Sequence, residues 1–179
     1  PARAMSFSNF MFKGTGIVNL VIPANITNLA TRGVFADCKN LASVTFHENV
    51  GAQVGGEFFM NCTALTSVVL PDCVMALGSG RRPQPMVGSS FQGCTALESV
   101  SVGPNFQQML YSSFENCTAL RTFTVRDLNP RASIMLADRA FANCVMLTST
   151  EFIPNVSMLG IETFANCASL DGSITMNPN

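Results

Sequence analysis

Charge is scarce in this 179-residue chain, and tryptophan is absent. Asp, Glu, Lys and Arg make up 12% of the residues, and the formal net charge is −1, whereas an average protein contains about 25% charged residues. A near-neutral chain lacks the basic surface with which proteins bind nucleic acid, so we expect no nucleic-acid partner. The chain is not of the disordered type either, because 47% of its residues are hydrophobic and disordered segments are poor in them.

Long apolar runs are also missing. No run approaches the roughly 18 residues that a membrane-spanning helix requires, so the sequence predicts no membrane span. The first residues, Pro1 to Met5, lack the apolar core of a secretory signal peptide. Two interpretations stay open. An export signal has been removed or lies elsewhere, or Pro1 is what is left of a complete protein after loss of its initiator Met.

Histidine is nearly absent, which excludes most nucleophilic and acid–base chemistry. Any Ser-His-Asp or Cys-His pair would have to use His47, which directly follows an apolar strand position and is expected at an exposed rim. The eleven carboxylates form no clustered pair, and the glycines near Arg81 lack the spacing of a phosphate-binding loop. We therefore predict no enzyme, no metal site and no cofactor.

The chain does contain a phrase repeated six times: a Phe, two residues, a Cys, two residues and a Leu. The copies begin at Phe35, Phe59, Phe91, Phe114, Phe141 and Phe164, and a weaker first copy has Met11, Gly14 and Ile17 in the same places. Repetition at a period in the twenties is typical of a solenoid, in which each coil packs on the next. We expect one domain over residues 1–179, with a degenerate first repeat at 11–34 and about seven coils.

Each repeat also predicts its local structure. After the Leu come two apolar residues at period two and often a Pro, as in Val68, Leu70 and Pro71, which indicates a short strand with one buried face. A weaker apolar group before the next Phe indicates an extended return with irregular backbone. The residue before each Cys is Asn, Asp or Gly, which tolerate left-handed backbone, and we interpret it as the end of one helical turn around the Phe.

Six of the seven cysteines occupy one repeat position. They are Cys38, Cys62, Cys94, Cys117, Cys144 and Cys167. Equivalent residues of a solenoid stack about 5 Å apart, like neighbouring strands, so we expect a column of buried, reduced thiols. Disulfides and a metal site are the alternatives, and the absence of C-x-x-C pairs argues against the metal. Cys73 lies outside the column.

Together these positions form a signature that is clearest in the stretches Arg139 to Leu147 and Thr163 to Leu170, which share Phe-Ala-Asn-Cys-x-x-Leu. The pattern resembles the BspA-like (Treponema pallidum-type) leucine-rich repeat family. The resemblance implies a curved solenoid whose short strands form a parallel sheet on the concave side. Together with the repeat pattern, it leads us to expect an α/β repeat solenoid that coils in the right-handed sense. It also implies surface or secreted proteins of bacteria and some protozoa, often adhesive, with no catalytic residues to carry over.

The residues beside the buried strand positions point outward, and most are small hydroxyls. Those predicted to contact a partner are Ser43, Thr45, Ser67, Ser99, Ser101, Thr122 and Thr124. Two interpretations stay open. Ser and Thr are comfortable on an exposed sheet, or a smooth, weakly charged face suits the docking of a protein or a glycan.

Two insertions, around residues 78–86 and 126–131, break the repeat period. Insertions in repeat proteins often lie on the working face, and arginine is overused at interaction hot spots. The further contact candidates are therefore Arg81, Arg82, Gln84, Arg126 and Arg131. The alternative is a pair of passive surface loops, because long insertions cost little stability.

We therefore expect a non-enzymatic interaction or adhesion module that binds a protein or glycan, at the cell surface or secreted as the resemblance implies. The alternative is a structural subunit of a larger assembly, such as a virion or a surface filament. An uncapped solenoid end exposes its core, so the apolar ends, including Phe7 to Phe12, would then be buried against neighbouring subunits.

Overall fold

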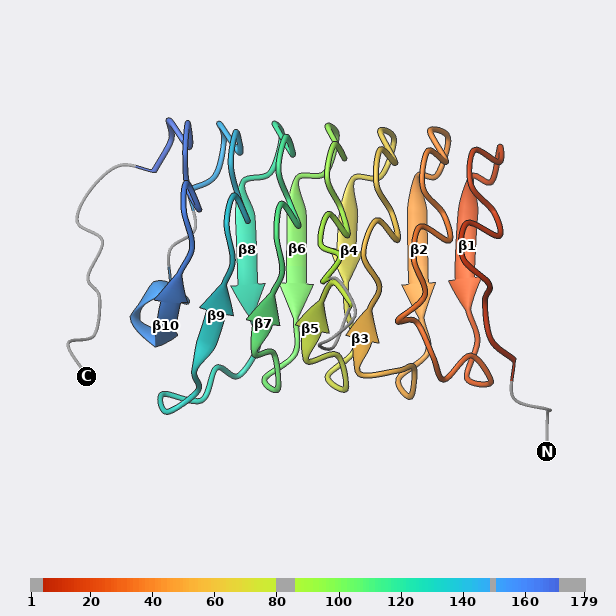
Figure 1. Cartoon of the computed structure of the whole chain (residues 1–179), viewed down its shortest axis with the longest axis horizontal. Coiled ribbons are helices and arrows are strands. Elements are labelled where there is room, and N and C mark those ends of the chain that lie inside the picture. The colour runs from red at the N-terminus through yellow and green to blue at the C-terminus, as the bar shows by residue number, and fades with distance from the viewer. Residues whose placement is uncertain (1–4, 80–85, 149–150, 171–179) are drawn as a thin grey trace.

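The computed structural model describes residues 5–79, 86–148 and 151–170, which wind into a parallel β-solenoid. Successive coils stack side by side along the long axis of the molecule (Figure 1). Each coil descends as one strand, turns a corner, returns as a second strand and passes through a compact turn before the next coil begins.

The strands predicted after each Leu form one side of the coil, here called the first sheet side. They are β1 (Asn19–Ile22), β2 (Ser43–Phe46), β4 (Ser67–Val69), β6 (Ser99–Val102) and β8 (Thr122–Val125). β1 pairs with β2, and β4, β6 and β8 pair in that order, all in parallel. The register aligns equivalent repeat positions, such as Val68 with Val100 and Val100 with Phe123. The predicted short parallel strands are confirmed in these five repeats. In the repeat that begins at Phe141 the expected strand falls partly outside the described residues, and Glu151 and Phe152 lie in a turn.

A second parallel sheet, which the sequence analysis did not predict, forms the returning side. Its strands are β3 (Gln53–Val54), β5 (Ala76–Leu77), β7 (Gln108–Met109), β9 (Ile134–Leu136) and β10 (Val156–Leu159), paired in that order. The expected extended return is confirmed, whereas its expected irregular backbone is not, because these strands pair in one parallel sheet. Three of these strands have only two residues, which is too short for an alternating pattern to be visible in the sequence.

The turn around each Phe contains two left-handed residues four positions apart. In the second repeat they are Glu57 (φ 57°) and Asn61 (φ 59°), on either side of Phe59. The N–H groups of these three residues donate to three carbonyl oxygens of the next coil, each at 2.8 Å. An α-helix would direct its N–H groups back into its own segment, so this turn is not helical.

The predicted left-handed residue before each Cys is confirmed. These residues are Asp37, Asn61, Gly93, Asn116, Asn143 and Asn166. The expected helical turn is not found, since the helical structure in the described ranges is one short 3₁₀-helix, η1 (Ile153–Asn155). The α/β label is therefore corrected to a β-solenoid.

Two columns of side chains fill the interior next to the turns. The rings of Phe12, Phe35, Phe59, Phe91, Phe114, Phe141 and Phe164 form a continuous stack, with neighbouring centroids 5.3–5.8 Å apart. Beside it, each thiol of the cysteine column donates to the Phe carbonyl of the preceding coil at 3.1–3.2 Å, as Cys117 does to Phe91. The predicted column of buried, unpaired thiols is confirmed.

The N-terminal end of the stack is partly covered by the apolar stretch that begins at Phe7. The Phe7 ring packs edge-on against Phe12 and Phe35, with centroids 6.2 and 5.5 Å away. Phe10 and Met11 stay exposed, at 39% and 55%. The stretch therefore acts as a cap on its inner side and presents an apolar surface on its outer side.

An ion-pair network crosses neighbouring coils beside the turns. Arg139 donates to Glu115 Oε1 from Nη2 at 2.5 Å and from Nε at 3.1 Å, and it also donates to Glu162. Gln92 donates to the other Glu115 oxygen at 3.1 Å. Burial acts to raise the pKa of Glu115, but hydrogen bonds from Arg139, Ser112 and Gln92 outweigh it, so the pKa is lowered.

The cysteine column predicts which thiols react. Only the thiolate attacks a thiol reagent, and burial raises the pKa of Cys94 to about 12. Cys73 lies outside the column and is half-buried. We expect Cys73 to be modified first in the native protein and the six column thiols only on unfolding, as measured by timed thiol counting. Rapid native modification of all seven would contradict the buried column.

The Glu115 network predicts a pH dependence of stability. A carboxyl whose pKa is lowered by folding contributes stability above its unfolded pKa of about 4.3, and this contribution is lost as the pH falls through the folded value. We expect Glu115→Gln to lower the free energy of unfolding near neutral pH by about 1–3 kcal/mol and to flatten its decline in acid. Urea titrations at several pH values test this, with the exposed Glu98→Gln as the matched control. Identical pH profiles for both variants would contradict it.

Candidate interaction surface

The outward side of the first sheet carries two aligned rows of side chains, here called the hydroxyl face. Across β1 and β2, Asn19 pairs with Ser43 and Val21 with Thr45. Across β4, β6 and β8, the rows are Ser67, Ser99 and Thr122, and Val69, Ser101 and Thr124. All seven hydroxyl residues proposed from the sequence thus lie on one face. Ser99 and Ser101 are half-buried and the other five are exposed. Their role in binding stays a prediction.

Some of these hydroxyls are used within the protein and others are free. Ser43 donates to Asn19 Oδ1 at 2.7 Å, and Ser101 Oγ accepts from Arg126 at 2.8 Å. Within the described ranges, the hydroxyls of Thr45, Ser67 and Thr122 have no protein partner. Water or a bound partner must therefore satisfy them.

An apolar strip interrupts the hydroxyls. Val21 is 70% exposed and Val69 is 61% exposed, and they lie on either side of Thr45, because β1 and β4 flank β2 (Figure 1). These three residues, here called the valine strip, carry no charge. Removing such side chains from water is favourable.

A hollow of about 640 Å³ adjoins the valine strip where the strands of this sheet end. It is lined by Phe46, Glu48, Asn49, Val69, Leu70, Pro71, Asp72, Cys73, Asn105 and Arg126. Arg126 donates from Nη2 to the Leu70 carbonyl and to Asp72 Oδ1, each at 2.7 Å, in addition to its bond with Ser101. Arg126, which the sequence suggested as a contact residue, therefore also links three coils. It forms part of the wall of this hollow, here called the Arg126 hollow.

The charges around the Arg126 hollow favour a partner group that donates hydrogen bonds. Asp72 pairs with Arg126, while Glu48 has no ion pair in the described part of the chain. The Cys73 thiol donates to the carbonyls of Glu48 and Val50 at 3.2 and 3.0 Å, and burial raises its pKa. Cys73 is therefore part of the wall and not a poised nucleophile.

Of the residues proposed from the insertions, Arg126 and Arg131 lie in the described part of the chain, and they line different hollows. Arg81, Arg82 and Gln84 lie outside the described residues. The base of their insertion is closed by Ser79 and Val87, which exchange two backbone hydrogen bonds of 2.9 and 2.7 Å. Arg131 is exposed and lines two hollows on the returning side.

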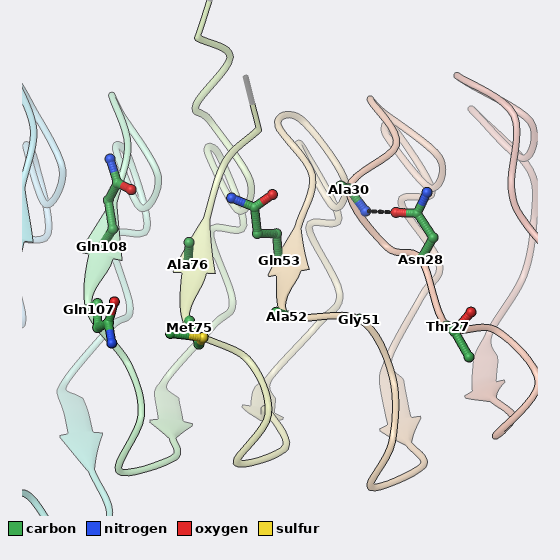
Figure 2. A pocket seen from close by; sticks show the side chains of 10 residues that line it. All are labelled: Thr27, Asn28, Ala30, Gly51, Ala52, Gln53, Met75, Ala76, Gln107 and Gln108. Carbon is green, nitrogen blue, oxygen red and sulfur yellow. Dashed lines mark hydrogen bonds between the residues drawn. The ribbon is translucent and has the colours of Figure 1, made fainter. Parts of the chain in front are cut away.

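The returning side carries a hollow that the sequence analysis missed. It has a volume of about 340 Å³ and is lined by Thr27, Asn28, Ala30, Gly51, Ala52, Gln53, Met75, Ala76, Gln107 and Gln108. Figure 2 shows Gln53 and Gln108 on either side of Ala76, which fits their positions on β3 and β7 around β5. Strands separated by one strand lie about 10 Å apart, so Ala76 is the floor of a notch between two amides.

Within the described ranges, no group of three or more His, Cys, Asp or Glu residues could hold a metal ion. His47 is exposed, and its Nδ1 accepts a hydrogen bond from the Asn49 N–H at 3.4 Å. In the same ranges, no helix has the length and apolar character needed to cross a bilayer.

The repeat matches a known protein family. Six copies of the BspA type leucine rich repeat region match residues 1–81 and 84–179. The chain belongs to the BspA-type leucine-rich repeat family. The resemblance seen in the sequence is thus confirmed, whereas the expected count of about seven repeats is not, since the family model finds six copies. No curated protein matches the chain.

Solved leucine-rich repeat structures share this fold. The T. pallidum leucine-rich repeat protein matches with a TM-score of 0.75 at 16% identity, over 94% of this chain and 72% of that one. A Bacteroides ovatus leucine-rich repeat protein gives 0.56 at 22%, over 92% and 50%. A leucine-rich cell surface protein of Faecalibacterium prausnitzii gives 0.55 at 22%, over 90% and 48%. The chain spans about half the length of the last two, and these likenesses concern the fold.

Proposed function

We propose that this protein is a non-enzymatic interaction module that binds a protein or glycan partner through the hydroxyl face and the adjoining Arg126 hollow. Leucine-rich repeats of this family generally mediate protein interaction or adhesion. The observation that carries the proposal is the exposed valine strip, because Val69 belongs both to that strip and to the wall of the hollow.

The chemistry of this surface suits a docking site. Exposed apolar side chains rimmed by polar groups mark interaction surfaces, and a hydroxyl residue lies directly beside each valine, Thr45 beside Val21 and Ser101 beside Val69. The free hydroxyls supply hydrogen bonds at low desolvation cost, since they are uncharged. The Arg126 hollow offers a recess for an anchoring side chain, and Glu48 and Asp72 favour one that donates hydrogen bonds.

We further propose a surface or secreted location. Proteins of this family are commonly found at the cell surface, and the similar F. prausnitzii protein is named as one. An exported module with few charges would meet its partner through shape and hydrogen bonding more than through long-range electrostatic steering.

The assembly hypothesis also has an observation in its favour. Apolar side chains are exposed on the first coil, where Met5 is 59% and Met11 55% exposed, and on the last described coil, where Ile161 is 74% exposed. Sedimentation of the purified chain separates the two hypotheses. A stable monomer supports the interaction module, and stable oligomers support the assembly subunit.

The valine strip predicts the effect of a charge placed on the hydroxyl face. We expect Val69→Asp to lower the affinity for a partner selected on protein and oligosaccharide arrays by at least tenfold, about 1.4 kcal/mol, because a carboxylate resists burial in the interface. Val145→Asp, an equal change at a position 37% exposed on a turn, is the matched control. Equal affinities of the two variants, both with native thermal unfolding, would show that partners bind elsewhere.

A further inference from the structure

We propose a second binding site, a groove along the returning side that takes an extended polypeptide segment carrying a carboxylate. This groove goes beyond the proposed function because it lies on the other sheet and is lined by different side chains. Among the described residues, only Asn105, at the corner between the two sides, lines both this groove and the Arg126 hollow.

Three adjoining hollows form the groove. Their volumes are about 340, 490 and 210 Å³. The first and second share Gln107 and Gln108 as walls, and the second and third share Arg131 and Ser133. The groove therefore follows the solenoid axis across consecutive strands of the returning sheet.

The length of the groove suits a short peptide. It begins at Asn28, which precedes Leu29, and Leu29 forms a parallel bridge with Val54 of β3. It continues past β5, β7 and β9 to Ser157 on β10. Five steps of about 4.8 Å between neighbouring strands give about 24 Å, which is the length of about seven residues of extended chain.

The walls present hydrogen-bonding groups that the protein itself does not use. Within the described ranges, the side-chain amides of Gln53, Gln107 and Gln108 have no protein partner. A primary amide is both a donor and an acceptor, which matches the donor and acceptor of each peptide unit. Gln53 and Gln108 lie on either side of Ala76 (Figure 2). Their strands are two steps apart, a separation of about 10 Å that equals about three residues of an extended peptide.

The charge of the groove lining indicates which kind of peptide segment the groove would bind. Among the described residues that line the three hollows, Arg131 is the single charged side chain, and it has no ion pair with any of the other described residues. A free guanidinium binds a carboxylate in a bidentate geometry. The groove therefore favours a segment that is otherwise uncharged and carries one Asp, one Glu or a C-terminal carboxylate.

The lining favours a polypeptide over a glycan. Phe106 is the one aromatic side chain among its described residues and is 1% exposed, so these residues offer no ring for stacking. The match between free amides and peptide units, together with the unpaired Arg131, fits a peptide backbone with an acidic residue. Oligosaccharide binding is accordingly the outcome that would count against this site.

The test uses the full chain against a displayed library of random octapeptides and an array of neutral and uronic-acid oligosaccharides. We expect enriched peptides to share one acidic position. We expect Arg131→Gln, and separately the Gln53→Ala/Gln108→Ala pair, to lower the affinity of a selected synthetic peptide by about tenfold or more. Arg121→Gln, an equal change at an exposed position on the other sheet side, should leave the affinity unchanged.

Three results would overturn the proposal: no peptide is enriched, the selected peptide binds Arg131→Gln as tightly as the unmodified chain, or oligosaccharides bind instead. If the double glutamine variant does not fold, Gln107→Ala replaces it, since that side chain is exposed. Val69→Asp should leave peptide binding unchanged, so the failure of this site and the failure of the hydroxyl face are distinguishable.

Discussion

The structure depends on backbone N–H groups that point along the solenoid axis from each turn to the next coil. The N–H groups of Phe59, Phe91 and Phe114 each donate across this step at 2.8 Å. A left-handed residue on either side of each Phe turns two further N–H groups in the same direction. Three parallel bonds per step fix the spacing of the coils, and this spacing lets the Phe rings stack and lets each thiol reach the preceding carbonyl.

The outer surfaces follow from that fixed spacing. Because equivalent residues of successive coils are held in register, single side chains become rows, and each patch of the surface is made by several coils. Arg126 joins three of them through Ser101, Leu70 and Asp72. One side presents hydroxyls and two exposed valines, whereas the other presents amides around a notch. The same scaffold therefore offers two chemically different surfaces.

The sequence predicted those features that a single residue type marks. Phe, Cys and Leu at fixed spacing indicated the core, and Asn, Asp or Gly before each Cys indicated one left-handed position. The second left-handed position was missed, because residues such as Glu57, Ser112 and Arg139 occupy it and carry no sign of that conformation. The hydroxyl face could be predicted because it follows the strands. The groove could not, since Gln53 and Gln108 become neighbours of Ala76 only through strands of two residues.

Native-state hydrogen exchange on the amides of Phe59, Phe91 and Phe114 tests the central claim, that bonds between turns hold the stack together. These amides should belong to the slowest class, with a free energy of opening equal to that of global unfolding by urea, because breaking one step separates the coils. Exchange of these amides at the rate of exposed corner residues, in a protein that is otherwise folded, would contradict the account.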